Sequence, residues 1–175
     1  MMMRKTWWRV LGILWVTTLG VQTIYGATMM IFERGVCASD HRGRDLRDLL
    51  TAEAIDGVAF VFVGEDGGGS LDYPDQVPSV VRAVLDRPGT FGVLICGSGQ
   101  GMVMTANRVK GIRAALCHDV ETAKKARAHN DANVLVLGRD YVCDDDARAI
   151  VRAFMSTPFE GGRHQVRIQK IDQIS

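Results

Sequence analysis

FGVLICGSGQGM, residues 91–102, is the segment that decides the fold of this chain. An apolar, β-prone run stops at Cys96, and three glycines follow at alternate positions, Gly97, Gly99 and Gly101. A strand that ends in a glycine-rich turn before a helix exposes backbone N–H groups to an anion in many α/β proteins. The segment therefore predicts an anion-stabilising loop, with a tight structural turn as the alternative. The spacing Gly-x-Gly-x-Gly matches neither a P-loop nor the dinucleotide-binding fingerprint.

Cys96 stands at the lip of this loop. A helix N-terminus and oriented amide groups both lower the pKa of a thiol. We therefore expect Cys96 to be a reactive thiolate rather than a packing residue. The other cysteines, Cys37, Cys117 and Cys143, lie in or beside apolar runs or at a predicted helix start, and we expect them to be inert.

Outward from this segment, apolar runs alternate with stretches of helical periodicity. The predicted strands cover residues 34–39, 57–64, 91–95, 112–116 and 134–137. The predicted helices cover residues 46–54, 74–85, 101–108, 120–128, 144–155 and 166–174, with Asp72 or Asp75 as a possible cap of the second. Repeated strand–helix units with short links predict a single-domain, three-layer, Rossmann-like α/β fold, with a five-stranded parallel sheet and helices on both faces.

Ligands of open parallel sheets bind beyond the carboxyl ends of the strands. Asp40-His41 follows the first predicted strand, Cys96-Gly97-Ser98 follows the third, and His118-Asp119 follows the fourth. We expect a site there, although for His118 a role in capping or local hydrogen bonding is favoured over chemistry. Asn107 is predicted to be structural, and Arg113 needs a partner, for instance at a subunit interface.

Composition excludes several classes of protein. The 175 residues include 21 Lys and Arg against 20 Asp and Glu, so no basic field for nucleic acid is expected. Four scattered cysteines without a Cys-x-x-Cys pair argue against a zinc site and a disulfide framework. A reducing, cytoplasmic compartment is the simpler interpretation.

The N-terminus allows three interpretations. Arg4, Lys5 and Arg9 precede a stretch, residues 10–32, that has no charged residue. The stretch resembles a secretory signal, or a membrane span made poor by its threonines and Gln22. The interpretation we favour is a start at Met29 or Met30, which makes residues 1–28 an N-terminal extension and residues 29–175 one domain without stable membrane association.

Seven segments in order resemble the type B ribose-5-phosphate isomerases, in the wider family that includes galactose-6-phosphate isomerase subunits. The resemblance runs from about Arg34 to Ile171. The segments are Ser39-Asp40-His41-x-Gly43, Asp72-Tyr73-Pro74-Asp75, residues 95–102, residues 106–114, Leu116-Cys117-His118-Asp119, residues 129–134 and residues 157–165.

The resemblance implies interconversion of ribose 5-phosphate and ribulose 5-phosphate without metal or cofactor. It implies that Cys96 is the base, that the amides of Gly97, Gly99 and Gly101 hold the developing negative charge, and that Ser98 binds the sugar or moves protons. His129 would open the sugar ring, and Asn130 would bind hydroxyls or the enediolate.

The remaining substrate contacts and the assembly also follow from the resemblance. Asp40 would contact ring oxygens or hydroxyls, Tyr73 would line the pocket, and His41, Arg163 and Arg167 would clamp the phosphate. His164 is expected to pack or bond locally. The family builds its site between two subunits, which implies a homodimer or a dimer of dimers.

Two departures from the family pattern stand out. Many members carry an arginine two residues after the glycine that ends the last strand, whereas this chain reads Gly138-Arg139-Asp140. Either a one-residue adjustment brings Arg139 to the phosphate, or phosphate affinity suffers. Another branch uses a carboxylate four residues beyond the cysteine position. Gln100 stands there in this chain and cannot act as a base.

Two other functions remain open from the sequence. One is an isomerase of a six-carbon sugar phosphate, such as allose or galactose 6-phosphate. The other is a non-catalytic module that binds sugar phosphates, because a fold alone does not establish catalysis.

Overall fold

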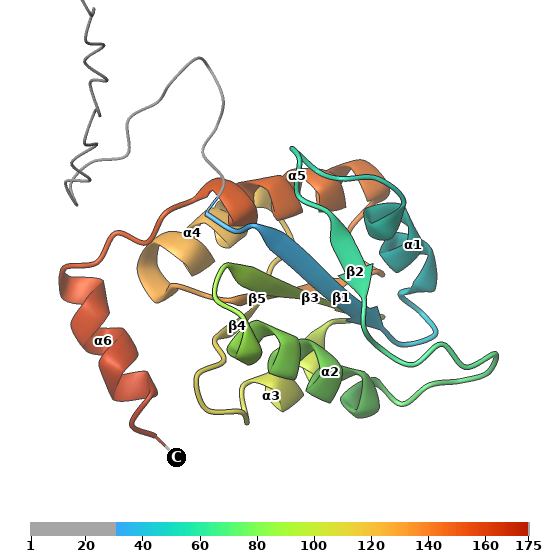
Figure 1. Cartoon of the computed structure of the whole chain (residues 1–175), viewed down its shortest axis with the longest axis horizontal. Coiled ribbons are helices and arrows are strands. Elements are labelled where there is room, and N and C mark those ends of the chain that lie inside the picture. The colour runs from blue at the N-terminus through green and yellow to red at the C-terminus, as the bar shows by residue number, and fades with distance from the viewer. Residues whose placement is uncertain (1–30, 175) are drawn as a thin grey trace, which may run out of the picture.

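The computed structural model describes residues 31–174, and the predicted extension, residues 1–28, lies outside them (Figure 1). The strands are β1 (Arg34–Ser39), β2 (Phe60–Phe62), β3 (Thr90–Cys96), β4 (Ala114–Leu116) and β5 (Val134–Gly138). The helices are α1 (Arg44–Ala52), α2 (Tyr73–Asp86), α3 (Gln100–Ala106), α4 (Val120–Asn130), α5 (Asp144–Ser156) and α6 (Arg163–Ile171). None of these helices is long and apolar enough to cross a membrane.

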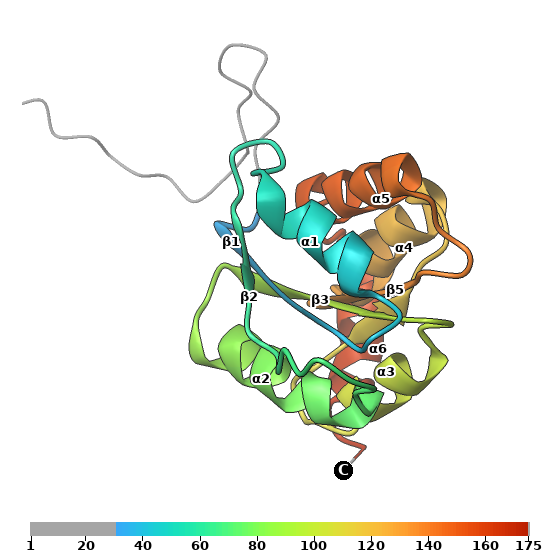
Figure 2. The ribbon, with the colours of Figure 1, turned by 90° about the vertical axis from the view of Figure 1, so that its right-hand side faces the viewer.

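The strands form one five-stranded parallel sheet in the order β2-β1-β3-β5-β4. Figure 2 shows α1, α4 and α5 on one face and α2 and α3 on the other. This arrangement confirms the predicted three-layer fold. The strand order reverses direction between the neighbouring strands β1 and β3, since β2 lies beyond β1 on one side and β5 and β4 lie beyond β3 on the other. The carboxyl ends of β1 and β3 therefore border the switch point, where such sheets bind ligands.

The central strand β3 is buried along its whole length because helices cover both of its faces. Its side chains alternate between two cores, as the pleat of a strand requires. Phe91, Val93 and Ile95 pack under α1, α4 and α5, whereas Leu94 and Cys96 pack against α2 and α3. The strand thus ends with a cysteine held between the sheet and α3.

Most predicted elements differ from the observed ones by one or two residues at an end, and three of the differences are described here. The strand predicted at residues 57–64 is reduced to β2, an edge strand with Val61 exposed, because Ile55 and Val58 pair in a turn with positive φ at Gly57. The strand predicted at residues 112–116 begins only at Ala114. The last helix begins at Arg163 and ends at Ile171, rather than covering residues 166–174.

Local polar contacts settle two further expectations. The Asn107 side chain donates to the Ala114 carbonyl at 3.0 Å and accepts from the Ala114 N–H at 2.8 Å, which confirms a structural role. Asp72 stands at the N-cap of α2, but its side chain makes no capping hydrogen bond. At α4 the capping residue is Asp119, whose carboxylate accepts from the Thr122 N–H at 2.7 Å.

Arg113 finds its partners within its own chain. Its guanidinium lies 2.9 Å from Asp131 and 3.5 Å from Asp172. The expectation that Arg113 needs a partner is confirmed, and the partners come from the end of α4 and the end of α6 rather than from the subunit interface given as an example.

Candidate active site

Cys96 ends β3 and lies within the turn that leads to α3. Its Sγ accepts a hydrogen bond from the Gly99 N–H at 3.1 Å, and the residue is only 4 % exposed. Gly99 has a φ of 78°, in the left-handed region, and a Cβ there would collide with Leu116. A Cβ at Gly101 would collide with the Tyr73 ring. Two of the three glycines are thus required by the backbone path and by close packing.

The pKa of the Cys96 thiol is shifted in the direction opposite to the predicted one. Burial raises it above the ordinary value, the Asp40 carboxylate adds to the increase, and the N–H of Gly99 opposes it. The prediction of a lowered pKa is therefore wrong for this structure, because loss of solvation outweighs the amide hydrogen bond. Burial acts more strongly on two other thiols and raises the pKa of Cys37 to about 12 and that of Cys117 to about 11. Cys143, at the N-cap of α5, is exposed.

Other predicted site residues gather around Cys96. Asp40 directly follows β1, is 6 % exposed, and accepts the Arg42 backbone N–H at 2.9 Å. His41 is exposed, with Nδ1 3.3 Å from the Leu71 N–H nitrogen. The Ser98 hydroxyl accepts from the Gln100 N–H at 3.3 Å. We call the group at this edge the thiol cluster, and it comprises Asp40, His41, Tyr73, Cys96, Gly97, Ser98, Gly99 and Gly101.

A second group lies where α4 ends and α6 begins. The His129 and His164 rings are stacked, with centroids 4.4 Å apart and planes 2° apart. A carboxylate oxygen of Glu160 lies 3.8 Å from Nε2 of His129 and 3.7 Å from Nε2 of His164. We call this group the histidine cluster, and it comprises His129, Asn130, Glu160, Arg163, His164 and Arg167.

The histidine cluster carries a ligand set that a metal ion could use. One donor atom each from His129, Glu160 and His164 lies within 4.8 Å of the others, and zinc accepts imidazole and carboxylate ligands. The Arg163 Nε–H, however, donates to Nε2 of His164 at 3.4 Å. A cationic guanidinium therefore competes with a metal ion for this nitrogen. Burial lowers the pKa of His164, and the neighbouring His129 adds to the decrease, which favours the neutral ring.

The two clusters lie at opposite ends of the sheet. α4 runs antiparallel to the strands and ends just before β5, whose first residue pairs with Gly92 and whose last pairs with Cys96. At about 3.3 Å per residue, β5 separates the two ends by roughly 13 Å. In Figure 1 the arrow of β1 points away from α6. Within one chain, the structure therefore does not bring His129, Asn130, Arg163 and Arg167 to Cys96.

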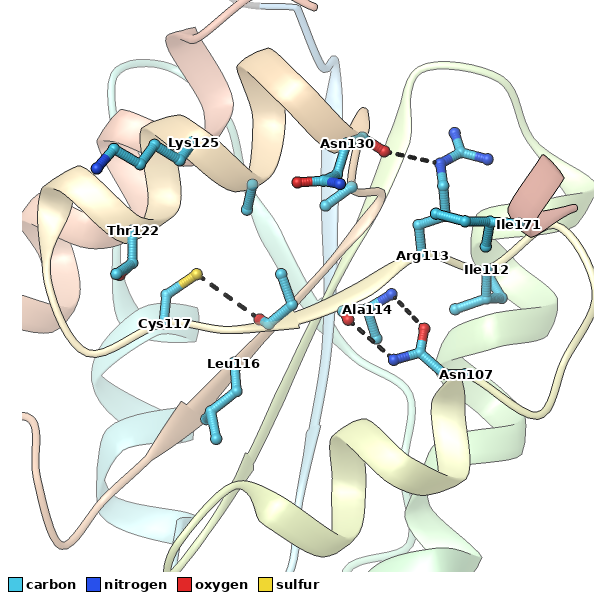
Figure 3. Close-up of a pocket in the computed structure, with 13 residues that line it drawn as sticks. Asn107, Ile112, Arg113, Ala114, Leu116, Cys117, Thr122, Lys125, Asn130 and Ile171 are labelled. Atoms are coloured by element: carbon cyan, nitrogen blue, oxygen red, sulfur yellow. Dashed lines mark hydrogen bonds between the residues drawn. The ribbon is translucent and has the colours of Figure 1, made fainter. Parts of the chain in front are cut away.

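A cavity of about 510 Å³ lies beside the edge strand β4 (Figure 3). Residues from α4, β4, α6 and the segments that flank β4 line it, among them Asn130, Ile171 and Cys117, which directly follows β4. None of its lining residues belongs to the thiol cluster. This hollow is therefore not the place where Cys96 meets a ligand.

Arg139 does not reach the thiol cluster. Its guanidinium bonds to Asp45 at 2.8 Å, to Asp144 at 3.1 Å and to the Val142 carbonyl at 2.9 Å. Asp140 instead faces the loop, where it pairs with Arg42 at 2.7 Å. The one-residue adjustment considered from the sequence is thus not what the structure adopts. Sequence reasoning missed Arg42 and Glu160, although both lie inside the segments that carry the family resemblance.

Comparison with solved structures identifies the class of protein that this fold and loop define. Ribose 5-phosphate isomerase B from Anaplasma phagocytophilum superposes with a TM-score of 0.77 at 48 % identity, covering 82 % of this chain and 99 % of that one. Ribose-5-phosphate isomerase B from Mycoplasma genitalium, solved with bound ribulose-5-phosphate, gives 0.74 at 37 % identity, covering 83 % and 97 %. The class is that of the sugar phosphate isomerases.

The family follows from the sequence comparison. The model described as Ribose/Galactose Isomerase matches residues 36–171, and this chain belongs to that family. Ribose-5-phosphate isomerase B of Escherichia coli is 38 % identical over 136 residues, which are 77 % of this chain and 91 % of that one. A Bacillus subtilis protein with the provisional name of a sugar phosphate isomerase is 45 % identical over 142 residues, 77 % of this chain and 91 % of that one. The names of the relatives thus agree on the reaction type and differ in how far they specify the sugar.

Proposed function

We propose that this protein interconverts ribose 5-phosphate and ribulose 5-phosphate through an enediolate. The observation that carries the proposal is a buried thiol on a glycine loop at the switch point of the sheet, in a chain of this family. A solved relative at 37 % identity holds ribulose 5-phosphate, which supports the five-carbon sugar.

In the proposed mechanism the Cys96 thiolate removes the proton from C2 of the open-chain aldose. The C–H electron pair forms the C1–C2 double bond, and the carbonyl electrons move onto the C1 oxygen. Backbone N–H groups of residues 97–101 would hold that charge, a contribution of about 10²–10³ in rate per donor in comparable sites. Ser98 moves a proton between the two oxygens, and the Cys96 thiol returns its proton to C1.

Asp40 is suited to orient the substrate hydroxyls. It is 6 % exposed and close enough to Cys96 to raise the pKa of that thiol, so its carboxylate lies beside the reacting carbons in this scheme. Tyr73 covers the loop at Gly101 and would close the pocket on that side. His41, at the rim, would contact the phosphate.

The site is completed by a second copy of the chain in our proposal. The separation of the two clusters supports this step, because His129 cannot act on a sugar bound at Cys96 of its own chain. A homodimer, or a dimer of dimers, would bring the partner's histidine cluster to the thiol cluster. His129 would then open the sugar ring, Asn130 would bind hydroxyls, and Arg163 and Arg167 would clamp the phosphate.

The first test measures ribulose 5-phosphate formed from ribose 5-phosphate by the full chain, beside Cys96→Ala and Cys117→Ala. We expect Cys96→Ala to lose about 10²–10⁴ in kcat, the contribution of a positioned base. Cys117→Ala removes a buried thiol elsewhere in the fold and should retain activity.

Two outcomes would contradict the proposal. Turnover of allose or galactose 6-phosphate in place of ribose 5-phosphate would assign the reaction to a six-carbon sugar. Tight binding of all these sugar phosphates without turnover of any would indicate a non-catalytic binding module.

A further inference from the structure

Arg42 crosses the glycine loop at the thiol cluster. It lies in the turn between β1 and α1, and a Cβ built on Gly97 would lie 2.9 Å from its Nε and 3.0 Å from its Cζ. The backbone N–H of Arg42 donates to Asp40 at 2.9 Å, which fixes the turn. Gly97 thus leaves room for a guanidinium one residue away from Cys96.

One carboxylate holds this guanidinium. Nη2 of Arg42 lies 2.7 Å from Asp140, whose own N–H donates to the Gly97 carbonyl at 3.0 Å. The Arg42 side chain is 57 % exposed, and within residues 31–174 its Nε and Nη1 make no hydrogen bond. Donors on Arg42 are therefore open to a ligand bound over the loop.

The other arginines of this edge are already engaged. Each is bound by carboxylate or carbonyl acceptors of its own surroundings, namely Arg44 by Gly67 and Gly69, Arg47 by Asp48 and Asp66, and Arg139 by Asp45 and Asp144. Without Arg42, the loop would face two carboxylates, Asp40 and Asp140, which would repel an anionic substrate. Among the described residues, Arg42 is the guanidinium that can offset them.

We propose that Arg42 binds the phosphate group of the substrate and that Asp140 competes with the phosphate for the same guanidinium. This takes the sugar phosphate isomerase activity proposed above as given. Before substrate binds, the ion pair with Asp140 keeps Arg42 positioned over Gly97. When the substrate binds, the phosphate oxygens engage the free Nε and Nη1, in the fork geometry that guanidinium groups offer to phosphate. The turn after β1 thus supplies the guanidinium that binds the phosphate, and Asp140, after β5, sets the affinity of this guanidinium for the phosphate.

The two partners of this ion pair should change phosphate binding in opposite directions. The probe is inorganic phosphate, titrated by calorimetry into the full chain, together with KM for ribose 5-phosphate. Arg42→Gln should raise the Kd and KM about 10- to 100-fold, the value of one or two charged hydrogen bonds. Asp140→Asn should lower the Kd several-fold, roughly 3- to 10-fold, because it removes the competing charge. Arg42→Lys should fall between Arg42→Gln and the unsubstituted chain.

Arg139→Gln is the matched control, since it makes the same charge change at the neighbour of Asp140 and should leave both constants unchanged. Thermal melting of each variant establishes that it folds. An unchanged phosphate Kd in folded Arg42→Gln would overturn the proposal. So would a raised Kd in Asp140→Asn, because a purely structural ion pair weakens the site whichever partner is removed.

The design separates this inference from the proposed function. Phosphate binding that depends on Arg42 in a chain without isomerase activity would refute the function and leave the anion site standing. Isomerase activity with a phosphate affinity that does not depend on Arg42 would support the proposed function and refute the anion site. If the unsubstituted chain binds neither inorganic phosphate nor a sugar phosphate, both are refuted.

Discussion

The two ends of the sheet differ in how firmly they hold their functional groups. At the carboxyl end, Cys96 and Asp40 are 4 % and 6 % exposed and are fixed by backbone hydrogen bonds within the switch point. At the amino end, the side chains of His129 and Glu160 are 39 % and 58 % exposed, at the end of one helix and before the start of another. The proposed base is thus built into the core, whereas the groups proposed for ring opening stand at the surface, where another molecule can meet them.

The two ends also differ in charge. The thiol cluster has two carboxylates, Asp40 and the neighbouring Asp140, with Arg42 as the counter-charge. The histidine cluster has two arginines, Arg163 and Arg167, with Glu160 as the counter-charge. Complementary charge on two surfaces steers their association. If two copies pair about a two-fold axis with the thiol cluster of one against the histidine cluster of the other, the symmetry gives two equal sites.

A complementation experiment tests most directly whether the thiol cluster of one chain and the histidine cluster of another form one site. We expect Cys96→Ala and His129→Asn chains to be close to inactive when each is pure. A heterodimer purified through two different tags should recover about half of the activity of the unsubstituted dimer, since one of its two sites regains both groups. Steady-state kinetics of the purified heterodimer gives the measurement.

The control is a heterodimer of the unsubstituted chain with the double variant, Cys96→Ala with His129→Asn. Each of its shared sites lacks one group, so it should be close to inactive. Were each site formed within one chain, the results would be reversed, with half activity in the control and none in the complementing pair.

A substrate that cannot close its ring isolates the histidine end. The phosphate of erythrose 4-phosphate occupies the oxygen that would close a furanose, so no ring-opening step is needed. We expect His129→Asn to lose about 10² in kcat/KM on ribose 5-phosphate, the lower range of acid–base catalysis. On erythrose 4-phosphate, the kcat/KM of His129→Asn should stay close to that of the unsubstituted chain.

His118→Asn serves as the control for loss of an imidazole, because His118 packs edge-on against Tyr141 outside both clusters. Equal losses of His129→Asn on the two sugars would contradict the division of labour between the two ends.

The sequence predicts the carboxyl end better than the contacts across it. Asp40 could be placed there because it follows the first predicted strand, and Cys96 and Ser98 because they follow the third, and local patterns are sufficient for that. The pairing of Arg42 with Asp140 joins positions 98 residues apart, and it depends on β1, β3 and β5 lying side by side. Neither the order of strands nor the direction of a long side chain is encoded in local periodicity.

The same limit explains the error over the thiol. A glycine loop at a helix start lowers the pKa of a cysteine, and the sequence shows the loop. The opposing effect is burial between the sheet and α3, which depends on tertiary packing. A sequence that shows one of two opposing causes cannot give the sign of their sum.

The pH dependence of the reaction tests that sign. Burial raises the pKa of the Cys96 thiol above its ordinary value, so at neutral pH the neutral thiol predominates and the thiolate proposed as the base is the minor form. Its fraction rises tenfold per pH unit below the pKa, so kcat/KM should rise by up to about tenfold per unit between roughly pH 7 and pH 9. A thiol with a lowered pKa would give a plateau over this range.

The rate of Cys96 alkylation by iodoacetamide, measured in a Cys143→Ala background to remove the exposed thiol, should follow the same curve without requiring turnover. If alkylation rises with pH while kcat/KM stays flat, Cys96 is not the base, and the rigid end of the molecule would hold a binding group rather than the reacting one.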